Sequence, residues 1–86
     1  MNLEGKRPEI DYPTKWEYKI IGSDIDEMIK VVENIIVDLE YNLSASNISR
    51  KDNYFSLNVS VLVPSEIVRD LIFRKLSAHP AIKFVI

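Results

Sequence analysis

Few side chains in this sequence could do acid–base or nucleophilic chemistry. His79 is the only histidine, and there is no cysteine. His79 directly precedes Pro80 at the expected end of a helix, where a histidine usually satisfies terminal carbonyl groups or points into solvent. A catalytic histidine also needs a partner, and the sequence offers none at a suitable spacing. We therefore expect no catalytic residue and no enzymatic activity.

A second group with chemical potential lies at an expected turn between a strand and a helix. Asp24, Asp26 and Glu27 follow Gly22 and Ser23 there. Carboxylates at a helix start are explained by capping and by the helix dipole, and they would repel a phosphate. Gly22 is explained by a turn with positive φ or by close packing. A ligand that did bind to Gly22, Ser23 and Asp24 would more credibly be an amino acid, through its ammonium group, than a nucleotide. No His, Asp or Glu group has metal-ligand spacing, so we expect no metal and no cofactor.

Polar residues alternate with apolar ones over 54–63. This period of two predicts a strand with one buried face and one face in solvent. On the solvent side we expect Lys19 of a neighbouring strand to join Ser56, Asn58 and Ser60. Because large charges are sparse at its centre, this face is a candidate interface with a protein partner or with a second copy of the chain. The alternative is a solvated sheet face with scattered apolar residues.

The elements that must position these residues follow from periodicity. Strands are expected at 15–21, 43–50, 54–63 and 81–86, with turn residues at 51–53. Helices are expected at 24–39 and, capped by Ser65, to residue 78. The order β-α-β-β-α-β predicts an α+β, ferredoxin-like sandwich, in which a four-stranded antiparallel sheet has both helices on one face. We interpret 1–14 as a flexible N-terminal arm and 15–86 as a single domain.

The periodicity also assigns side chains to the two faces of the sheet. Trp16 and Tyr18 should face the helices. The apolar stripe of the second helix should comprise Ile67, Val68, Leu71, Ile72 and Leu76, with Arg69, Arg74 and Lys75 on its solvated face. In the last strand, Ile82, Phe84 and Ile86 should be on one face. The open face should then contain no aromatic residue, with these candidates: Glu17, Lys19, Ile21, Ser56, Asn58, Ser60, Leu62, Lys83 and Val85.

Composition narrows the classes of partner. The chain has 86 residues and a formal net charge of −2, which gives no general attraction to nucleic acid or to an anionic membrane. An open face without aromatic residues also disfavours the base stacking used by RNA-binding domains. The start of the sequence has no apolar segment typical of a secretory signal, and no apolar stretch is long enough to span a bilayer. We expect a cytoplasmic protein that binds neither nucleic acid nor membrane.

Three segments resemble a known family. Residues 12–22 place Tyr-Pro-Thr before an aromatic-x-Tyr-Lys strand that ends in Gly22, residues 49–61 contain the second strand of the expected hairpin, and residues 82–86 form a short closing strand. Together they resemble the YbeD-like family of small bacterial proteins. The resemblance implies a fold similar to ACT-type regulatory domains, and it supplies no functional residues to transfer. We therefore expect a non-enzymatic regulatory or protein-interaction module that self-associates, and the alternative is a small-metabolite (amino acid) sensor.

Overall fold

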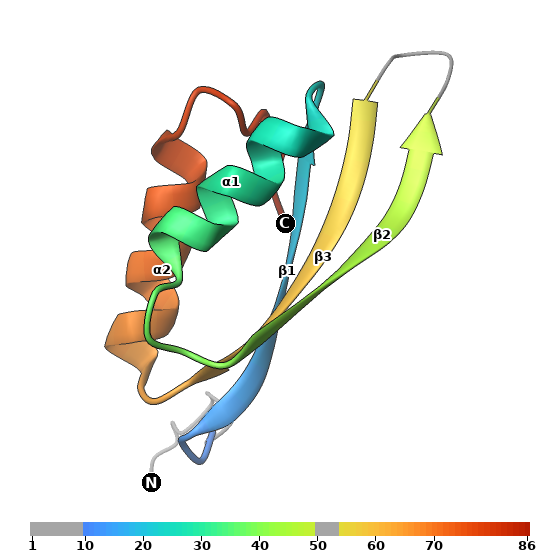
Figure 1. Ribbon diagram of the computed structural model, residues 1–86. Helices are drawn as coiled ribbons and strands as arrows, with labels where there is room; N and C mark the ends of the chain where they lie inside the picture. Colours follow the sequence, from blue (N-terminus) through green and yellow to red (C-terminus); the bar gives the residue numbers. More distant parts are fainter. Residues whose placement is uncertain (1–9, 50–53) are drawn as a thin grey trace, which may run out of the picture.

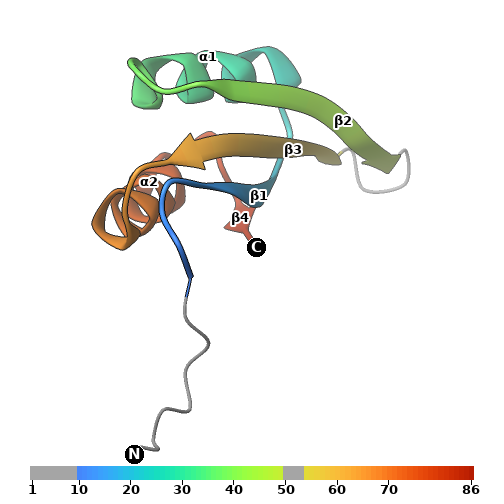
Figure 2. The same ribbon diagram turned by 90° about the horizontal axis from the view of Figure 1, so that it is seen from below.

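The computed structural model describes residues 10–49 and 54–86 of the chain (Figure 1). Its strands form one antiparallel sheet in the order β2-β3-β1-β4. Both helices pack against the same face of this sheet, which confirms the predicted α+β architecture with the first and third strands at the centre (Figures 1 and 2). The elements are β1 (Thr14–Gly22), α1 (Ile25–Ile35), β2 (Tyr41–Ser49), β3 (Tyr54–Val63), α2 (Glu66–Ala78) and β4 (Phe84–Val85).

The two central strands provide most of the core. β1 pairs with β3 in an unbroken register from Thr14 opposite Val63 to Gly22 opposite Phe55. Residues directly opposite each other on paired strands lie on the same face of the sheet. The alternating apolar side chains of both strands therefore lie together under the helices. Tyr18 is 2% exposed and Trp16 packs against the core, as expected for both. The fully buried members of these strands include Ile20, Val59, Val61 and Val63.

Helix α1 begins as predicted and ends early. The Asp24 side chain caps it by accepting a hydrogen bond from the Glu27 N–H at 3.2 Å. The prediction of a helix to residue 39 is wrong, because the last helical hydrogen bond runs from the Ile36 N–H to the Val32 carbonyl. Val37 beyond it is 73% exposed. The chain turns there to enter β2, so the 3.6-residue period of the apolar positions outlasts the helix itself.

Helix α2 has its predicted bounds and a different buried stripe. Ser65 caps it by accepting from the Val68 N–H at 3.2 Å, and Ile72 and Leu76 are buried. Ile67, however, is 79% exposed and Leu71 is 44% exposed. At 3.6 residues per turn, Ile67 lies roughly 140° around the helix from Ile72, which is too far to share its face. The predicted stripe was therefore too wide.

Strand β2 lies at one edge of the sheet, as its polar composition suggested. It spans Tyr41–Ser49 rather than 43–50, and its register with β3 shifts between Ala45 and Asn47. Such a shift marks a β-bulge, in which one extra residue lies opposite the partner strand. The turn predicted at 51–53 lies outside the described residues.

The prediction of a strand at 81–86 is wrong in both the length and the orientation of the strand, β4. Only Phe84 and Val85 form the strand, and they lie opposite Ile21 and Ile20. Val85 therefore shares the helix side with buried Ile20, while Phe84 is on the open side and is 60% exposed. Ile82 is buried as expected, but from the turn in which its N–H donates to the His79 carbonyl. The buried position of Ile82 therefore does not indicate which face of the sheet the residues of β4 occupy.

The division into an arm at 1–14 and a domain at 15–86 stays a prediction. β1 begins at Thr14, and Tyr12 just before it packs against the core. Residues 1–9 of the predicted arm lie outside the described residues. In the part of the chain that the structure describes, neither helix is long and apolar enough to cross a membrane.

Candidate functional site

The four predicted interface residues lie together on the open face of the sheet. Lys19 is directly opposite Asn58, and Ser56 and Ser60 of β3 flank that pair. Their side chains are half-buried between neighbouring strands. The structure therefore brings these residues together on one face, and their role as an interface stays a prediction.

The open face is more apolar than the sequence suggested. Phe84 lies opposite Ile21, and Ile86 lies opposite Lys19, with which it exchanges two main-chain hydrogen bonds of 3.1 and 2.8 Å. Ile86 is 73% exposed. Tyr54 is on this face as well, because it alternates with Ser56 along β3. The expectation of an open face without aromatic residues is therefore wrong, and the exposed apolar side chains gather at the corner of the face where β1 meets β4.

The predicted ligand site at the first strand–helix turn is closely packed. Gly22 is buried, and a Cβ built on it would lie 2.5 Å from the Ala81 carbonyl oxygen and 2.9 Å from the Met28 sulfur. No glycine in the described residues has positive φ, so close packing explains Gly22. Asp24 is occupied as the cap of α1, and Ser23 is exposed. Gly22, Ser23 and Asp24 are therefore adjacent in the turn. The close packing at Gly22 and the helix cap at Asp24 explain their surroundings.

His79 has a structural role at the end of α2. It is the C-cap residue, and its Nδ1 accepts a hydrogen bond from the Ala81 N–H at 3.1 Å. Its own N–H donates to the Leu76 carbonyl at 3.3 Å. These contacts fix the turn that leads to β4, in agreement with the helix-end position predicted for this histidine.

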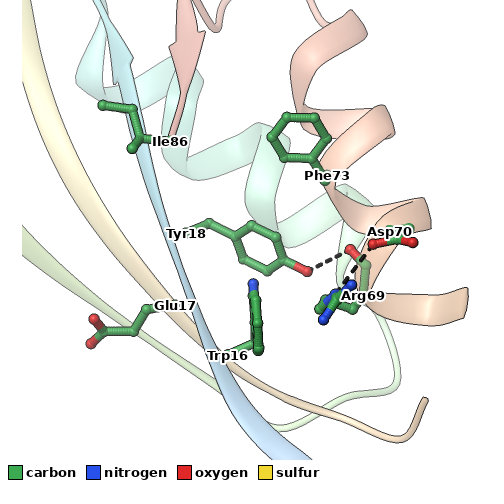
Figure 3. Close-up of a pocket in the computed structure, with 7 residues that line it drawn as sticks. All are labelled: Trp16, Glu17, Tyr18, Arg69, Asp70, Phe73 and Ile86. Carbon is green, nitrogen blue, oxygen red and sulfur yellow. Dashed lines mark hydrogen bonds and ion pairs between the residues drawn. The ribbon is translucent and has the colours of Figure 1, made fainter. Parts of the chain in front are cut away.

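A cavity that the sequence did not predict lies between the outer side of β1 and helix α2. It has a volume of about 550 Å³ and is open to solvent (Figure 3). Trp16 and Tyr18 extend from β1 toward α2 in this view, and Glu17 points to the other side of the strand. The lining residues are Trp16, Glu17, Tyr18, Arg69, Asp70, Phe73 and Ile86.

Tyr18 joins the strand to the helix at the floor of this cavity. Its hydroxyl donates a hydrogen bond of 2.6 Å to the Arg69 carbonyl oxygen. Burial raises the pKa of Tyr18 to about 12. The positive charge of nearby Arg69 lowers this pKa and so offsets the effect of burial only in part. The phenol is therefore neutral at physiological pH, and its hydroxyl proton is held in the hydrogen bond to the Arg69 carbonyl oxygen.

Arg69 is the residue of this region that sequence reasoning placed wrongly. Its guanidinium carbon lies 4.4 Å from the centre of the Trp16 ring, which is the geometry of a cation–π contact. Its side chain is only 18% exposed. Its partners are Asp70 (Nε to Oδ1, 3.2 Å), Tyr12 (Nη1 to the hydroxyl, 3.2 Å) and Glu66 (Nη2 to Oε2, 3.6 Å).

The charge state of Arg69 follows from these contacts. Partial burial opposes its charge, but the hydrogen bond to Asp70 and the nearby Tyr12 outweigh it and raise the pKa of the guanidinium. Arg69 precedes the buried Ile72 and Leu76 by three and seven residues, so helical spacing alone could have placed it on the inner side. Arg74 and Lys75 are exposed, as predicted for all three basic residues.

The lining of the cavity combines apolar and polar side chains. Among the described residues, no group of three or more His, Cys, Asp or Glu side chains could hold a metal ion. Two polar groups of the cavity are already paired: the Tyr18 hydroxyl with a main-chain carbonyl, and Arg69 with two carboxylates and a phenol. What the geometry offers is exposed apolar surface beside fixed polar groups, and that combination is typical of surfaces that bind other proteins.

Comparison with known proteins places the chain in a bacterial family. It is 38% identical over 81 residues to the uncharacterized protein Cj0253 of Campylobacter jejuni, covering 94% of this chain and 91% of that protein. It is 28% identical over 81 residues to a UPF0250 protein of Janthinobacterium, covering 90% and 89%.

A solved structure shows the same fold. The solution structure of protein HP0495 from H. pylori matches with a TM-score of 0.83 and 28% sequence identity, covering 100% of this chain and 94% of that one. The model of a protein family of unknown function, DUF493, matches residues 7–86. The resemblance stated from residues 12–86 is thereby confirmed, and the chain belongs to the DUF493 family, which includes the UPF0250, YbeD-like proteins.

Proposed function

We propose that the protein is a non-enzymatic interaction module that binds a protein partner on the open face of its sheet. The observation that supports this most is the corner formed by half-buried Ile21 with exposed Phe84 and Ile86, which continues into Lys19 and Asn58. Apolar side chains at the centre of a patch and polar ones around it are the usual composition of a protein interface. The helices occupy the other face, so this corner is accessible.

The charges of this face favour a protein over a nucleic acid. The Lys19 ammonium shares the face with the Glu17 carboxylate, and the whole chain has a net charge of −2. A nucleic-acid surface needs an excess of positive charge to offset the phosphates. A regulatory role in the cytoplasm, like that of the ACT domains whose fold the family resembles, belongs to the same proposal.

The test is photo-cross-linking in the native bacterium. A photoreactive residue at Ser60 should give a discrete adduct with another protein, and a photoreactive residue at the exposed Asn34 of α1 should not. Asn58→Arg should abolish the adduct at Ser60, because it places a second cation beside Lys19 and enlarges a half-buried position. The matched control is Asn34→Arg, which should leave the adduct and the melting temperature unchanged. An adduct that survives Asn58→Arg in a folded protein would exclude this face.

A sensor of small metabolites at Gly22, Ser23 and Asp24 is the alternative, with less support because packing fills that turn. It predicts thermal stabilisation by an amino acid. A ligand at 100 times its Kd adds about 2.7 kcal/mol. Asp24→Ala would then have to remove this stabilisation beyond the cost of losing a helix cap, which is about 1 kcal/mol. A screen of amino acids and nucleotides without a shift would exclude the alternative.

A further inference from the structure

Strand β4 covers only part of the outer edge of β1. It pairs with Ile20 and Ile21, and the hydrogen bonds between Lys19 and Ile86 extend that pairing by one residue. Along the rest of β1, from Thr14 to Tyr18, no described residue continues the sheet on this side. A stretch of five residues therefore presents a strand edge beside the cavity under α2.

The direction of the main chain identifies the groups that this edge presents. In an antiparallel sheet, successive residues direct their N–H and C=O groups to opposite neighbours. Lys19 uses both groups toward β4. By the same two-residue period, Glu17 and Lys15 direct their N–H and C=O groups outward, while Trp16 and Tyr18 bond to β3. Exposed donors and acceptors of this kind are a template for another strand.

We propose that this edge pairs with the same edge of a second copy of the chain, in an antiparallel arrangement centred on Trp16. The free stretch is symmetric about Trp16, so a two-fold axis there places Thr14 opposite Tyr18 of the second copy and Lys15 opposite its Glu17. Lys15 and Glu17 would form the hydrogen-bonded pairs and would place opposite charges against each other twice. This edge therefore favours a partner strand in which a basic, an aromatic and an acidic residue follow one another. Lys15-Trp16-Glu17 of the second copy has this order.

The helix side of the junction offers surface for the same contact. Trp16 is half-buried, and Phe73, which lines the same cavity, is 44% exposed. In the paired arrangement, the two Trp16 rings lie opposite each other in a non-hydrogen-bonded pair, where side chains approach most closely. Each Phe73 lies on its own α2, on the same side of the sheet. The contact would cover exposed aromatic surface on one side of the sheet and pair opposite charges on the other.

This self-association is centred on the strand edge at Trp16, whereas the proposed partner site is the open face around Asn58, and neither proposal depends on the other. Asn58 lies on β3, on the far side of β1 from the free edge. Asn58→Arg should therefore leave the dimer unchanged while it abolishes the cross-link at Ser60. The two proposals can thus fail separately.

The decisive experiment measures molecular mass by sedimentation equilibrium from about 1 μM to about 1 mM, a range that spans weak and moderate affinities. The unmodified chain should pass from monomer to dimer. Glu17→Pro should remain monomeric throughout, because it removes an outward N–H. Proline is tolerated on an edge strand where the N–H faces outward, so the circular dichroism spectrum should be unchanged.

A charge exchange tests the pairing register independently, in case the proline variant fails to fold. Lys15→Glu places carboxylates against carboxylates in both copies and should weaken the dimer at least tenfold. Lys15→Glu combined with Glu17→Lys restores opposite charges in every pair and should recover it. A monomer at all concentrations would overturn the proposal. A dimer that survives Glu17→Pro, or a double variant as weak as Lys15→Glu, would also overturn it.

Discussion

The sheet has two edges that are built in different ways. On one side, β2 is rich in Ser and Asn, and a bulge between Ala45 and Asn47 interrupts its register. On the other side, the free stretch of β1 has an unbroken register with β3 and contains Trp16 and Tyr18. Bulges and polar residues discourage unwanted pairing at an edge. The difference indicates that β2 closes the sheet, whereas Thr14–Tyr18 leaves it available for another strand.

The helix above each part of β1 sharpens the difference. Tyr18 and Arg69 connect the free stretch to α2 through the 2.6 Å hydrogen bond and the contact with Trp16. At the covered end, Gly22 allows the Ala81 carbonyl and Met28 to approach β1 closely, which places β4 against the strand. β1 therefore has one end that pairs with β4, the closed end. Its other end has no partner strand on its outer side but is fixed to α2. Four predictions separate these features.

The largest effect is expected from ionising Tyr18. Its pKa of about 12 in the folded protein lies above the value of 10.0 for a free phenol. The neutral form is therefore favoured by folding, and this stability is complete below pH 10 and is lost as the pH rises toward 12. A difference of about two pKa units corresponds to about 2–3 kcal/mol. Urea unfolding between pH 9 and 12 should show this loss, and Tyr18→Phe should show a smaller one. Equal losses in both proteins would contradict the assignment.

The closed end should be sensitive to one methyl group. Gly22→Ala should destabilise the fold by about 2 kcal/mol, because the new Cβ meets a main-chain oxygen and the Met28 sulfur. Ser23→Ala at the exposed neighbouring position is the control and should change the unfolding free energy by less than about 0.5 kcal/mol. Chemical denaturation measures both, and a neutral Gly22→Ala would show that β4 does not pack as described.

The contact between helix and free edge should contribute less. Arg69→Met keeps the length of the side chain and removes the guanidinium from Trp16, which should cost about 1 kcal/mol. Because Trp16 is the only tryptophan, its fluorescence reports this contact directly. The emission spectrum should change in Arg69→Met and not in Arg74→Met, its exposed counterpart on the same helix. The same change in both variants would exclude a specific Arg69–Trp16 contact.

The protected edge can be opened by removing its bulge. Deletion of Ser46 brings Asn47 and the rest of β2 into the register that Tyr41–Ala45 already have with β3. We expect an effect of only about 0.5 kcal/mol on stability, together with new concentration-dependent association at β2. Light scattering of the deletion variant, in a background that contains Glu17→Pro, measures this. If the straightened edge stays monomeric, the bulge is not what protects β2.

The sequence predicted the fold where periodicity was sustained by burial. The alternation in 54–63 reflects a strand with one face in the core, so it determined both the bounds and the orientation of β3. The alternation in 81–86 failed because only Phe84 and Val85 are paired, and a strand of two residues has no period to read. Helix α1 was extended too far because Leu39 continues the apolar spacing and packs on the core from outside the helix.

The candidate site was less predictable from the sequence. Placement of Lys19, Ser56, Asn58 and Ser60 on one face followed from strand alternation and sheet order, which are local rules. Arg69 was missed because its residue type suggested solvent, although its spacing from Ile72 placed it inward. The free edge of β1 depends on how far β4 reaches along it. That is a tertiary property, and no motif in the sequence encodes it.

The central claim is that one edge of this sheet pairs with another molecule and the other does not. Amide hydrogen exchange measured by NMR at low and high protein concentration tests it residue by residue. The Lys15 and Glu17 amides should exchange freely in dilute solution and become protected as concentration rises. The Leu43 amide, which faces outward on β2 by the same alternation, should exchange freely at both concentrations. Protection at Leu43, or exchange at Glu17 that does not depend on concentration, would contradict the account.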